Sequence, residues 1–325
     1  MRAIVCKEFA SPENLEVSEV SQPKPNDNQV LVRVESTGLG YVDALTVAGR
    51  YQIKPSLPFV PGNELSGVIE KTGKKVRHLR PGQRVLASSS GGLAEYAIVE
   101  ESRCTPIPDS LSYDAAAGFL VNYCTAFHGF NYCGNLQEKE TVLILGASGG
   151  VGIAAIDVAK AMGASVIAAA STKKKREACL TAGAEHVLDY SKQNWREKLK
   201  EILAGVPLNV VYDPVGGDFA EPALRSLGAD GRYLVVGFAA GDIPRFPVNL
   251  MHLKRCSVVG VNWGGHIAEN PSSSREVLTT LMEWVAESRI NPASSDTFGL
   301  NDAGKAMMKM LTRKAIGKIV INPQE

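Results

Sequence analysis

The sequence predicts an α/β protein in which a doubly wound parallel sheet is inserted into a mainly β-strand domain. Two observations support this prediction. Residues 1–118 contain short β-rich runs separated by proline and glycine clusters, which is typical of an antiparallel domain. Further along, short apolar strands alternate with helical segments, and helical crossovers indicate a parallel sheet. Because 325 residues exceed what one hydrophobic core usually holds, we expect two domains.

The expected elements follow one another in a regular order. In the first part, strands are predicted at residues 3–6, 29–36, 66–73, 83–88 and 94–99, before a helical stretch at 113–130. The strands of the parallel sheet are predicted at residues 141–145, 165–170, 186–190, 209–217, 232–238 and 257–264. Helices at 276–288 and 302–314 and a strand at 317–321 close the chain and are assigned to the first domain. The predicted domains are therefore residues 1–118 with 264–325, and residues 119–263.

The charge balance argues against nucleic acid and membrane surfaces as partners. Lys and Arg (35) nearly cancel Asp and Glu (34), leaving a net charge of +1, so no strong field is available to attract phosphates or anionic lipid. No apolar run is long enough to span a bilayer, and the start "MRAIVCKEFA" does not resemble a signal peptide. We expect a cytoplasmic protein.

The six cysteines lie far apart and form no C-x-x-C pair, so neither a disulfide framework nor a thiolate zinc knuckle is predicted. We expect these thiols to be reduced and mostly buried. The histidines His78, His128, His186, His252 and His266 show no metal-ligand spacing, which favours structural over catalytic roles.

A glycine-rich turn in "TVLILGASGGVGIAAIDVAKAMG" predicts a dinucleotide site. Gly146, Gly149 and Gly152 lie between an apolar strand and an amphipathic helix, at the spacing G-x-x-G-x-x-G. Glycine allows a tight turn and a close approach of the backbone to a pyrophosphate, which the helix N-terminus attracts. The alternative is that the glycines mark only a turn, but the strand, the helix and the further βα units favour the dinucleotide interpretation.

The residues after the second strand of this sheet indicate the choice of cofactor. An NAD site usually has Asp or Glu there, whereas this chain has "AAASTKKKRE". Ser171 and Thr172 can donate hydrogen bonds to a 2′-phosphate, and the Lys and Arg residues at 173–176 can neutralise it. These cations are alternatively a solvated helix start, but cations are unfavourable at a helix N-terminus unless an anion lies nearby. We predict NADPH.

Nearly the whole chain resembles the medium-chain dehydrogenases/reductases, and in particular the zinc-independent quinone oxidoreductases related to zeta-crystallin. The residues that support this are "GLGYVDALTVAGRY", "PFVPGNELSGVIE", "PGQRV", "GGLAEYAIV", "GASGGVG", "YDPVGG", "GFAAGDIP" and "GVNWGG". The last two stretches, with "FPVNLMHLKRCSV" between them, resemble the quinone oxidoreductase-like branch. The resemblance implies a Rossmann domain inserted into a discontinuous GroES-like barrel domain.

The same resemblance argues against catalytic zinc. Zinc alcohol dehydrogenases carry Cys, His and Cys at positions that match Gly40, Asn63 and, less securely, Val121. Glycine and valine cannot bind zinc, and an Asn amide replaces imidazole poorly. The four-cysteine structural zinc lobe is also missing, because "PGQRVLASSSGGLAEY" runs through its place. We therefore predict no metal.

The resemblance also implies which residues hold the cofactor. Thr125, with Phe238, Val261 and Asn262, is expected to hold the nicotinamide. The turn that includes Ser148, Gly149, Gly150 and Val151 is expected to hold the pyrophosphate. Ser171, Lys175 and Tyr190 are expected to surround the 2′-phosphate, although Tyr190 is alternatively a half-buried tyrosine at a strand end.

The catalytic candidates come from the first domain. Tyr41, Asp43 and Tyr51 lie where the substrate cleft is expected, and Asn63 in "PGNE" either orients substrate or only satisfies its turn. By resemblance, Tyr51 in "AGRY" matches the proton donor of zinc-independent enoyl-thioester reductases. A tyrosine hydroxyl is normally protonated at neutral pH, so it could deliver a proton to carbon after hydride transfer. Its alternative role is packing under a loop. Glu64 is assigned to structure within its own domain.

Three functions remain open at this stage. The first is an NADPH-dependent reductase that transfers hydride to a quinone or related activated carbonyl. The second is a 2-enal, enone or enoyl-thioester reductase, and the third is a non-enzymatic NADPH-binding protein with a structural or regulatory role. A homodimer is expected, because pairing two copies of the last Rossmann strand would cover an open sheet edge.

Overall fold

The computed structural model describes residues 1–293 and 296–325, which form two compact units. Unit 1 comprises Met1–Val121 and Pro292–Glu325, and unit 2 comprises Asn122–Asn291. The second boundary therefore lies after Asn291 instead of after residue 263. Helix α10 (Pro271–Ala286) belongs to unit 2 because the Trp284 ring packs on Phe127 with ring centroids 5.4 Å apart. That aromatic contact is a tertiary one, which the local sequence pattern does not reveal.

Unit 2 contains a six-stranded parallel sheet, which confirms the predicted doubly wound fold. Its strands are β8 (Thr141–Ile144), β9 (Ser165–Ala169), β10 (His186–Leu188), β11 (Val210–Asp213), β12 (Arg232–Val235) and β13 (Ser257–Gly260). Their order is β10-β9-β8-β11-β12-β13. The order reverses between β8 and β11, and ligands of open α/β sheets bind at such a point.

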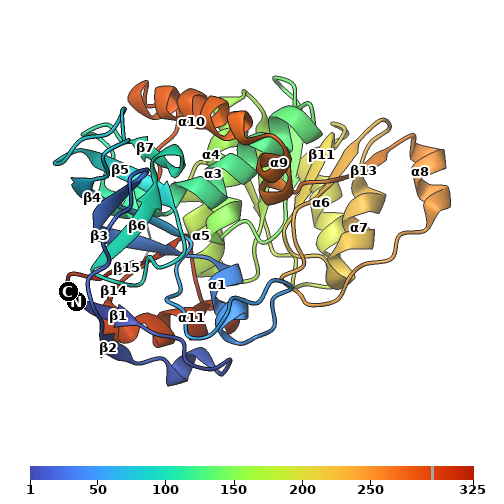
Figure 1. Ribbon diagram of the computed structural model, residues 1–325. Helices are drawn as coiled ribbons and strands as arrows, with labels where there is room; N and C mark the ends of the chain where they lie inside the picture. Colours follow the sequence, from blue (N-terminus) through green and yellow to red (C-terminus); the bar gives the residue numbers. More distant parts are fainter. Residues whose placement is uncertain (294–295) are drawn as a thin grey trace. The chain divides into compact units, whose positions relative to one another are not determined.

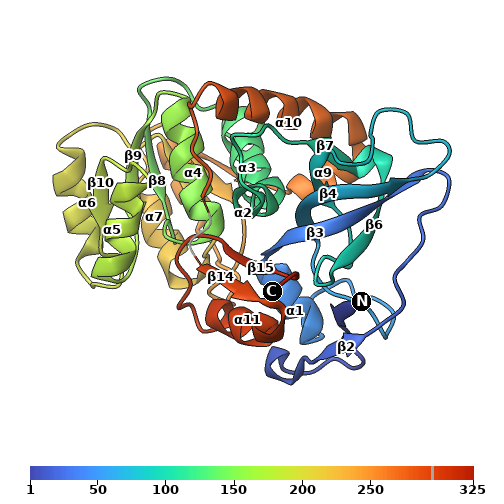
Figure 2. The ribbon, with the colours of Figure 1, turned by 90° about the vertical axis from the view of Figure 1, so that its left-hand side faces the viewer.

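Helices cover both faces of this sheet. Leu143 and Ile167 pack with Trp195 of α6 (Trp195–Leu203) and Leu224 of α7 (Ala220–Ser226) in one buried cluster. The residues that alternate with these along each strand point to the other face of the sheet. Figure 1 labels β11 and β13 of this sheet together with α6 and α7. Figure 2 shows α4 (Gly150–Ala161) and α5 (Lys173–Thr181) beside β8, β9 and β10.

Unit 1 is built on a mainly antiparallel sheet with the strand path β14-β15-β3-β4-β5-β7, and β6 also pairs with β3. The strands of this sheet are β3 (Gln29–Leu39), β4 (Glu64–Thr72), β5 (Arg84–Ser88), β6 (Tyr96–Glu100), β7 (Cys104–Pro106), β14 (Asp296–Gly299) and β15 (Ile319–Asn322). Strand β15 runs antiparallel to β3, so the end of the chain completes a sheet that the beginning started. The predicted discontinuous domain is therefore present.

The remaining elements of unit 1 lie around this sheet (Figure 2). Strands β1 (Arg2–Ile4) and β2 (Val17–Glu19) form a separate antiparallel pair. The helices of this unit include α1 (Tyr41–Val47), α2 (Tyr113–Ala117) and α11 (Ala303–Leu311). Helix α11 buries Ala306 and Met307 in one apolar cluster with Leu39 and Ile319 of the sheet.

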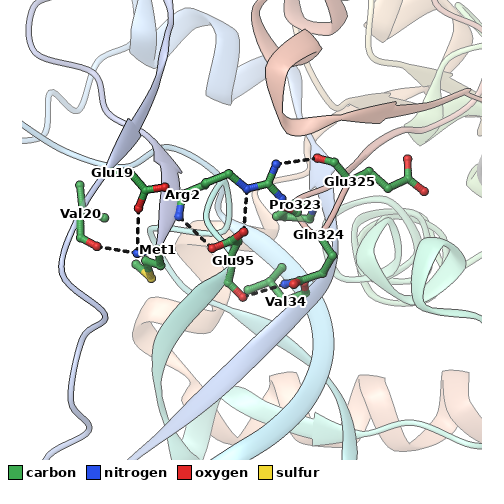
Figure 3. A network of polar contacts seen from close by, with 9 residues as sticks. All are labelled: Met1, Arg2, Glu19, Val20, Val34, Glu95, Pro323, Gln324 and Glu325. Atoms are coloured by element: carbon green, nitrogen blue, oxygen red, sulfur yellow. Dashed lines mark hydrogen bonds and ion pairs between the residues drawn. The ribbon is translucent and has the colours of Figure 1, made fainter.

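Both chain ends are held in unit 1 by the polar network of Figure 3. The Arg2 side chain donates to Glu95 Oε1 at 2.7 Å and to the carbonyl of Pro323 at 3.1 Å. The Gln324 amide donates to the carbonyl of Val34 at 2.8 Å. The N-terminal strand and the last residues of the chain are thus joined through the side chain of Arg2, which bonds to both Glu95 and Pro323.

All six cysteines carry free thiols; Cys6, Cys124, Cys179 and Cys256 are buried, and Cys104 and Cys133 are partly buried. Across residues 1–293 and 296–325, none of the helices combines the length and the apolar character needed to cross a bilayer.

Candidate active site

The glycine turn of unit 2 connects β8 to α4, as the sequence predicts. Gly146 has a φ of +56°, which favours glycine. A Cβ atom on Gly152 would come within 2.6 Å of the Ala147 backbone, so only glycine allows this approach. Gly149 is the N-cap residue of α4 and has no side chain that could bond to the helix start. Because the first N–H groups of a helix have no intrahelical partner, those of α4 can bind a ligand. The turn therefore fits the pyrophosphate of a dinucleotide.

A second loop lies against this turn. Asp213, the last residue of β11, is buried and accepts hydrogen bonds from the N–H groups of Val215 at 2.7 Å and Gly216 at 2.9 Å. The Tyr233 hydroxyl donates to its other oxygen. Val215 is the residue that a Cβ on Gly146 would meet first, at 2.6 Å. Asp213 is thus a site-shaping residue that sequence reasoning missed, although "YDPVGG" was quoted for the family resemblance.

The basic segment after β9 is organised by an acid that the sequence analysis did not consider. Arg176 donates to the carbonyl of Ala170 at 3.1 Å and forms an ion pair with Asp189 at 3.0 Å. Thr172 caps α5 by accepting from the N–H of Lys175 at 3.3 Å. Tyr190, beside Asp189, packs on Phe219 with ring centroids 4.5 Å apart. Arg176 is therefore committed to Asp189, and Lys173 forms a longer, exposed ion pair with Glu177 at 3.8 Å.

Three of the four residues predicted to hold the nicotinamide lie on two segments of unit 2. Thr125 is on α3 (Phe119–Phe127), and Val261 and Asn262 follow β13. A Cβ on Gly129 would come within 3.3 Å of Val261, so the two segments are in close contact. Asn262 caps α9 (Trp263–Glu269) by accepting from the N–H of Gly265 at 3.0 Å. These contacts bring Val261 and Asn262 to the segment just after Thr125.

Phe238, the fourth predicted nicotinamide contact, follows β12 and is 43% exposed. It lies close to Gly216, where a Cβ would meet its ring at 3.2 Å. It is therefore positioned by the loop that Asp213 holds.

His128 joins the same two segments more firmly than the sequence indicates. It begins a π-helical turn (His128–Cys133), is 6% exposed, and packs on Trp263 and His266 with ring centroids 5.4 and 4.5 Å away. Burial lowers the pKa of His128, and the nearby His266 lowers it further. Tyr132 completes this aromatic cluster. The histidine is thus a neutral packing group whose tertiary neighbours no sequence motif predicts.

In unit 1, the buried Asp43 and the exposed Asn63 form a hydrogen-bonded pair. Asp43 lies on α1 and is 3% exposed, and Asn63 immediately precedes β4. The Asn63 Nδ2 atom donates to Asp43 Oδ1 at 2.6 Å, and the N–H of Gly40 donates to Asp43 Oδ2 at 2.7 Å. Burial raises the pKa of Asp43 to about 6, against the opposing effects of these hydrogen bonds and of the Lys318 charge. The pair borders a cavity of about 200 Å³.

Glu64 is bonded within unit 1. Its carboxylate forms a buried ion pair with Lys318, the residue before β15. Its Oε2 atom accepts from the N–H of Val121 at 3.0 Å. Glu64, at the start of β4, is therefore bonded both to Lys318 near the end of the chain and to Val121.

The positions that bind zinc in related dehydrogenases converge here, but their side chains do not fit a metal. Gly40 and Val121 contribute only backbone N–H groups to Asp43 and Glu64, and the Asn63 amide is bonded to Asp43. In the described part of the chain, no group of three or more His, Cys, Asp or Glu residues is arranged to hold a metal ion.

The two tyrosine candidates are near this pair in sequence but are not bonded to it. Tyr41 is the first residue of α1 and is 38% exposed, and Tyr51 follows the turn after α1 and is half-buried. Among residues 1–293 and 296–325, no hydrogen bond links either hydroxyl to Asp43 or Asn63. Both remain predictions.

Comparisons with known proteins agree with this architecture. Residues 26–109 match the alcohol dehydrogenase GroES-like domain, and residues 150–287 match the zinc-binding dehydrogenase family. Quinone oxidoreductase-like protein 2 homolog of Nematostella vectensis is 37% identical over 327 residues, which cover 100% of this chain and 89% of that protein. Quinone oxidoreductase-like protein 2 of Bos taurus is 36% identical over 324 residues, with 99% and 92% covered.

A solved structure of Escherichia coli quinone oxidoreductase complexed with NADPH superposes with a TM-score of 0.90 at 27% identity and covers 99% of this chain and 100% of that one. A GroES-like domain combined with a Rossmann sheet defines the class of medium-chain dehydrogenases/reductases. Within that class, the chain belongs to the quinone oxidoreductase family, a family of oxidoreductases.

Proposed function

We propose that this protein is an NADPH-dependent, zinc-independent reductase that transfers hydride to a quinone or a related activated carbonyl. The observation that carries the proposal is the combination of a pyrophosphate-fitting turn with a lysine-rich helix start, and of a polar pair of Asp43 and Asn63 beside a cavity. NADPH supplies the hydride, and the protein's own residues bind it and orient the substrate.

The residues of unit 2 fit this cofactor. The uncapped start of α4 would hold the pyrophosphate, with Ser148 and Val151 on the same turn. Ser171, Lys175 and Tyr190 would surround the 2′-phosphate, because the segment after β9 offers lysines and a hydroxyl instead of the acid that an NAD site uses. The NADPH bound to the Escherichia coli relative supports this choice.

The residues of unit 1 would act on the substrate without a metal. Since Gly40 and Val121 offer no donor side chain, Asn63 is the only polar side chain among the three former ligand positions. A quinone accepts hydride readily, so orientation and exclusion of water can supply most of the rate.

The test is NADPH oxidation followed with a panel of quinones and enones, with NADH run in parallel. We expect quinone-dependent oxidation of NADPH, with NADPH bound more tightly than NADH. Tighter binding of NADH, or stoichiometric zinc in the purified protein with activity lost to a chelator, would contradict the proposal.

A second candidate function is the reduction of a 2-enal, enone or enoyl-thioester. It is favoured by Tyr51, whose position in "AGRY" matches the proton donor of enoyl-thioester reductases. Tyr51→Phe should lower turnover only if a proton has to reach carbon after hydride transfer. Equal turnover of Tyr51→Phe and wild type with every acceptor would remove this candidate.

The non-enzymatic alternative predicts tight NADPH binding with no acceptor reduced in the same panel. The full-length relatives named as quinone oxidoreductase-like proteins favour the enzymatic alternatives over this one.

We further propose a homodimer through β13. This strand is an edge of the unit 2 sheet, where Val258 and Val259 are half-buried and the outer hydrogen-bonding groups are available for pairing. Light scattering at micromolar concentration should give the mass of two chains, and the mass of one chain would refute the proposal.

A further inference from the structure

The amide of Asn63 is held in one of its two orientations. An ionised carboxylate only accepts hydrogen bonds, and both oxygens of Asp43 are used, one by the N–H of Gly40 at 2.7 Å and one by Asn63 Nδ2 at 2.6 Å. The reversed amide would place its oxygen against a second acceptor with no hydrogen between them. The nitrogen of Asn63 must therefore face Asp43.

The fixed nitrogen of Asn63 also determines where the amide oxygen lies. The oxygen of a side-chain amide points away from its nitrogen, so Asn63 Oδ1 points away from Asp43. Within residues 1–293 and 296–325 this oxygen has no protein partner, and Asn63 is exposed and lines the cavity of about 200 Å³. Unit 1 thus offers a fixed hydrogen-bond acceptor to whatever enters this cavity.

We propose that Asp43 is a positioning residue that fixes Asn63 so that its Oδ1 accepts a hydrogen bond from a substrate hydroxyl. This inference rests on the proposed function and names the substrate class: hydroxyl-bearing quinones or activated carbonyls. A bare quinone has only acceptor oxygens, so it cannot bond to Asn63 Oδ1. A hydroxyl substituent supplies the missing donor, and a site with a fixed polar group discriminates against the analogue that lacks its partner.

Protonation of Asp43 should weaken this preference. A protonated carboxyl can donate to Asn63 Oδ1, so the amide can then turn and offer its N–H groups to the cavity. Burial raises the pKa of Asp43 to about 6, and the charged groups that act on it are Lys318 and Glu64, which are paired with each other. The preference for a hydroxyl should therefore be present well above pH 6 and decline below it.

The test compares 2-(hydroxymethyl)-1,4-naphthoquinone with 2-methyl-1,4-naphthoquinone, which share the ring and differ by one hydroxyl. At pH 8, wild type should favour the hydroxyl compound about 3- to 10-fold in kcat/KM, the range that one neutral hydrogen bond provides. Asp43→Asn frees the amide to turn, and Asn63→Leu removes it, so both variants should bring the ratio close to one. Structural damage alone would lower kcat/KM for both quinones by the same factor and leave their ratio unchanged.

Equilibrium binding of the same two quinones to the protein loaded with NADP⁺ separates this inference from the proposed function. A binding preference without reduction would contradict the proposed function but support the hydroxyl site. Reduction of both compounds with a wild-type ratio near one, or a ratio that Asp43→Asn and Asn63→Leu leave unchanged, would overturn the inference. If either variant fails to fold, the wild-type ratio at pH 8 and pH 5 decides, and an equal ratio at both would overturn it.

Discussion

The buried ion pair between Glu64 and Lys318 allows a quantitative test of how unit 1 is held together. The two side chains are 3% and 6% exposed, and Glu64 Oε2 also accepts from the N–H of Val121 at 3.0 Å. Lys318→Met keeps most of the apolar stem but removes the ammonium group. Glu64 is then a buried carboxylate that has lost its ion-pair partner.

Breaking a buried pair in this way should cost about 3–5 kcal/mol of unfolding free energy, because the remaining charge is uncompensated. Neutralising the acid as well, in Glu64→Gln with Lys318→Met, should recover most of that loss. Lys309→Met is the matched control, because Lys309 pairs with Asp296 at 2.9 Å with side chains 33% and 30% exposed. A partly exposed pair of this kind should contribute no more than about 1 kcal/mol.

Hydrogen exchange of peptides from β3 and β4, followed by mass spectrometry, is the appropriate assay. The three tryptophans, Trp195, Trp263 and Trp284, all lie in unit 2, so fluorescence would not report on unit 1. The slowest amides of β3 and β4 should exchange about 100- to 4,000-fold faster in Lys318→Met, as expected for a loss of about 3–5 kcal/mol. An acceleration no larger than that of Lys309→Met, or a double variant no slower than Lys318→Met, would refute the reasoning.

Three further predictions concern single side chains. Because burial raises the pKa of Asp43 to about 6, the folded protein holds this proton more tightly than the unfolded chain, so the stability of unit 1 should fall as pH rises from about 4 to about 6. Asp43→Asn should therefore stabilise unit 1 by up to about 3 kcal/mol at pH 7 and by much less at pH 4, and an equal effect at both pH values in hydrogen exchange would contradict this. Lys175→Ala removes one charge-assisted phosphate contact, so it should weaken NADPH binding about tenfold without changing NADH binding. Titration calorimetry with both cofactors checks this, and an unchanged NADPH affinity would rule out the assigned contact. Tyr233→Phe removes a hydrogen-bond donor from the buried Asp213 and should lower the unfolding free energy of unit 2 by about 1–3 kcal/mol, measured by urea unfolding followed by tryptophan fluorescence. Tyr132 is more exposed, so the control Tyr132→Phe should change this free energy by less than about 0.5 kcal/mol. Equal effects of the two variants would show that the bond to Asp213 contributes little.

Much of the fold of unit 2 follows from local sequence pattern. Each predicted strand of the parallel sheet is present at its expected place, because a buried parallel strand requires a continuous apolar run that can be recognised without its neighbours. The glycine turn at 146–152 is equally local, since the positive φ of Gly146 and the close approach at Gly152 are properties of one strand–turn–helix segment. Sequence alone was sufficient for these features.

The candidate site depended more on tertiary structure. Asn63 and Asp43 were both named from the sequence, but their bond, and therefore the orientation of the amide, arises only when β4 is placed beside the start of α1. His128 and Asp213 were not assigned to the site because their partners, Trp263 and Tyr233, lie far along the chain.

By itself, then, the sequence determined the strands of the parallel sheet, the cofactor turn and the loss of zinc-binding side chains, because each depends on the type of residue at a position or on a short-range period. Only the tertiary structure decided the grouping of α10 with unit 2, the partner of Glu64 and the direction in which Asn63 presents its oxygen. Lys318 lies 254 positions from Glu64, and the antiparallel pairing of β15 with β3 brings the end of the chain back to the first sheet. Contacts of such separation are set by how whole strands and helices pack, and no short stretch of sequence contains that information.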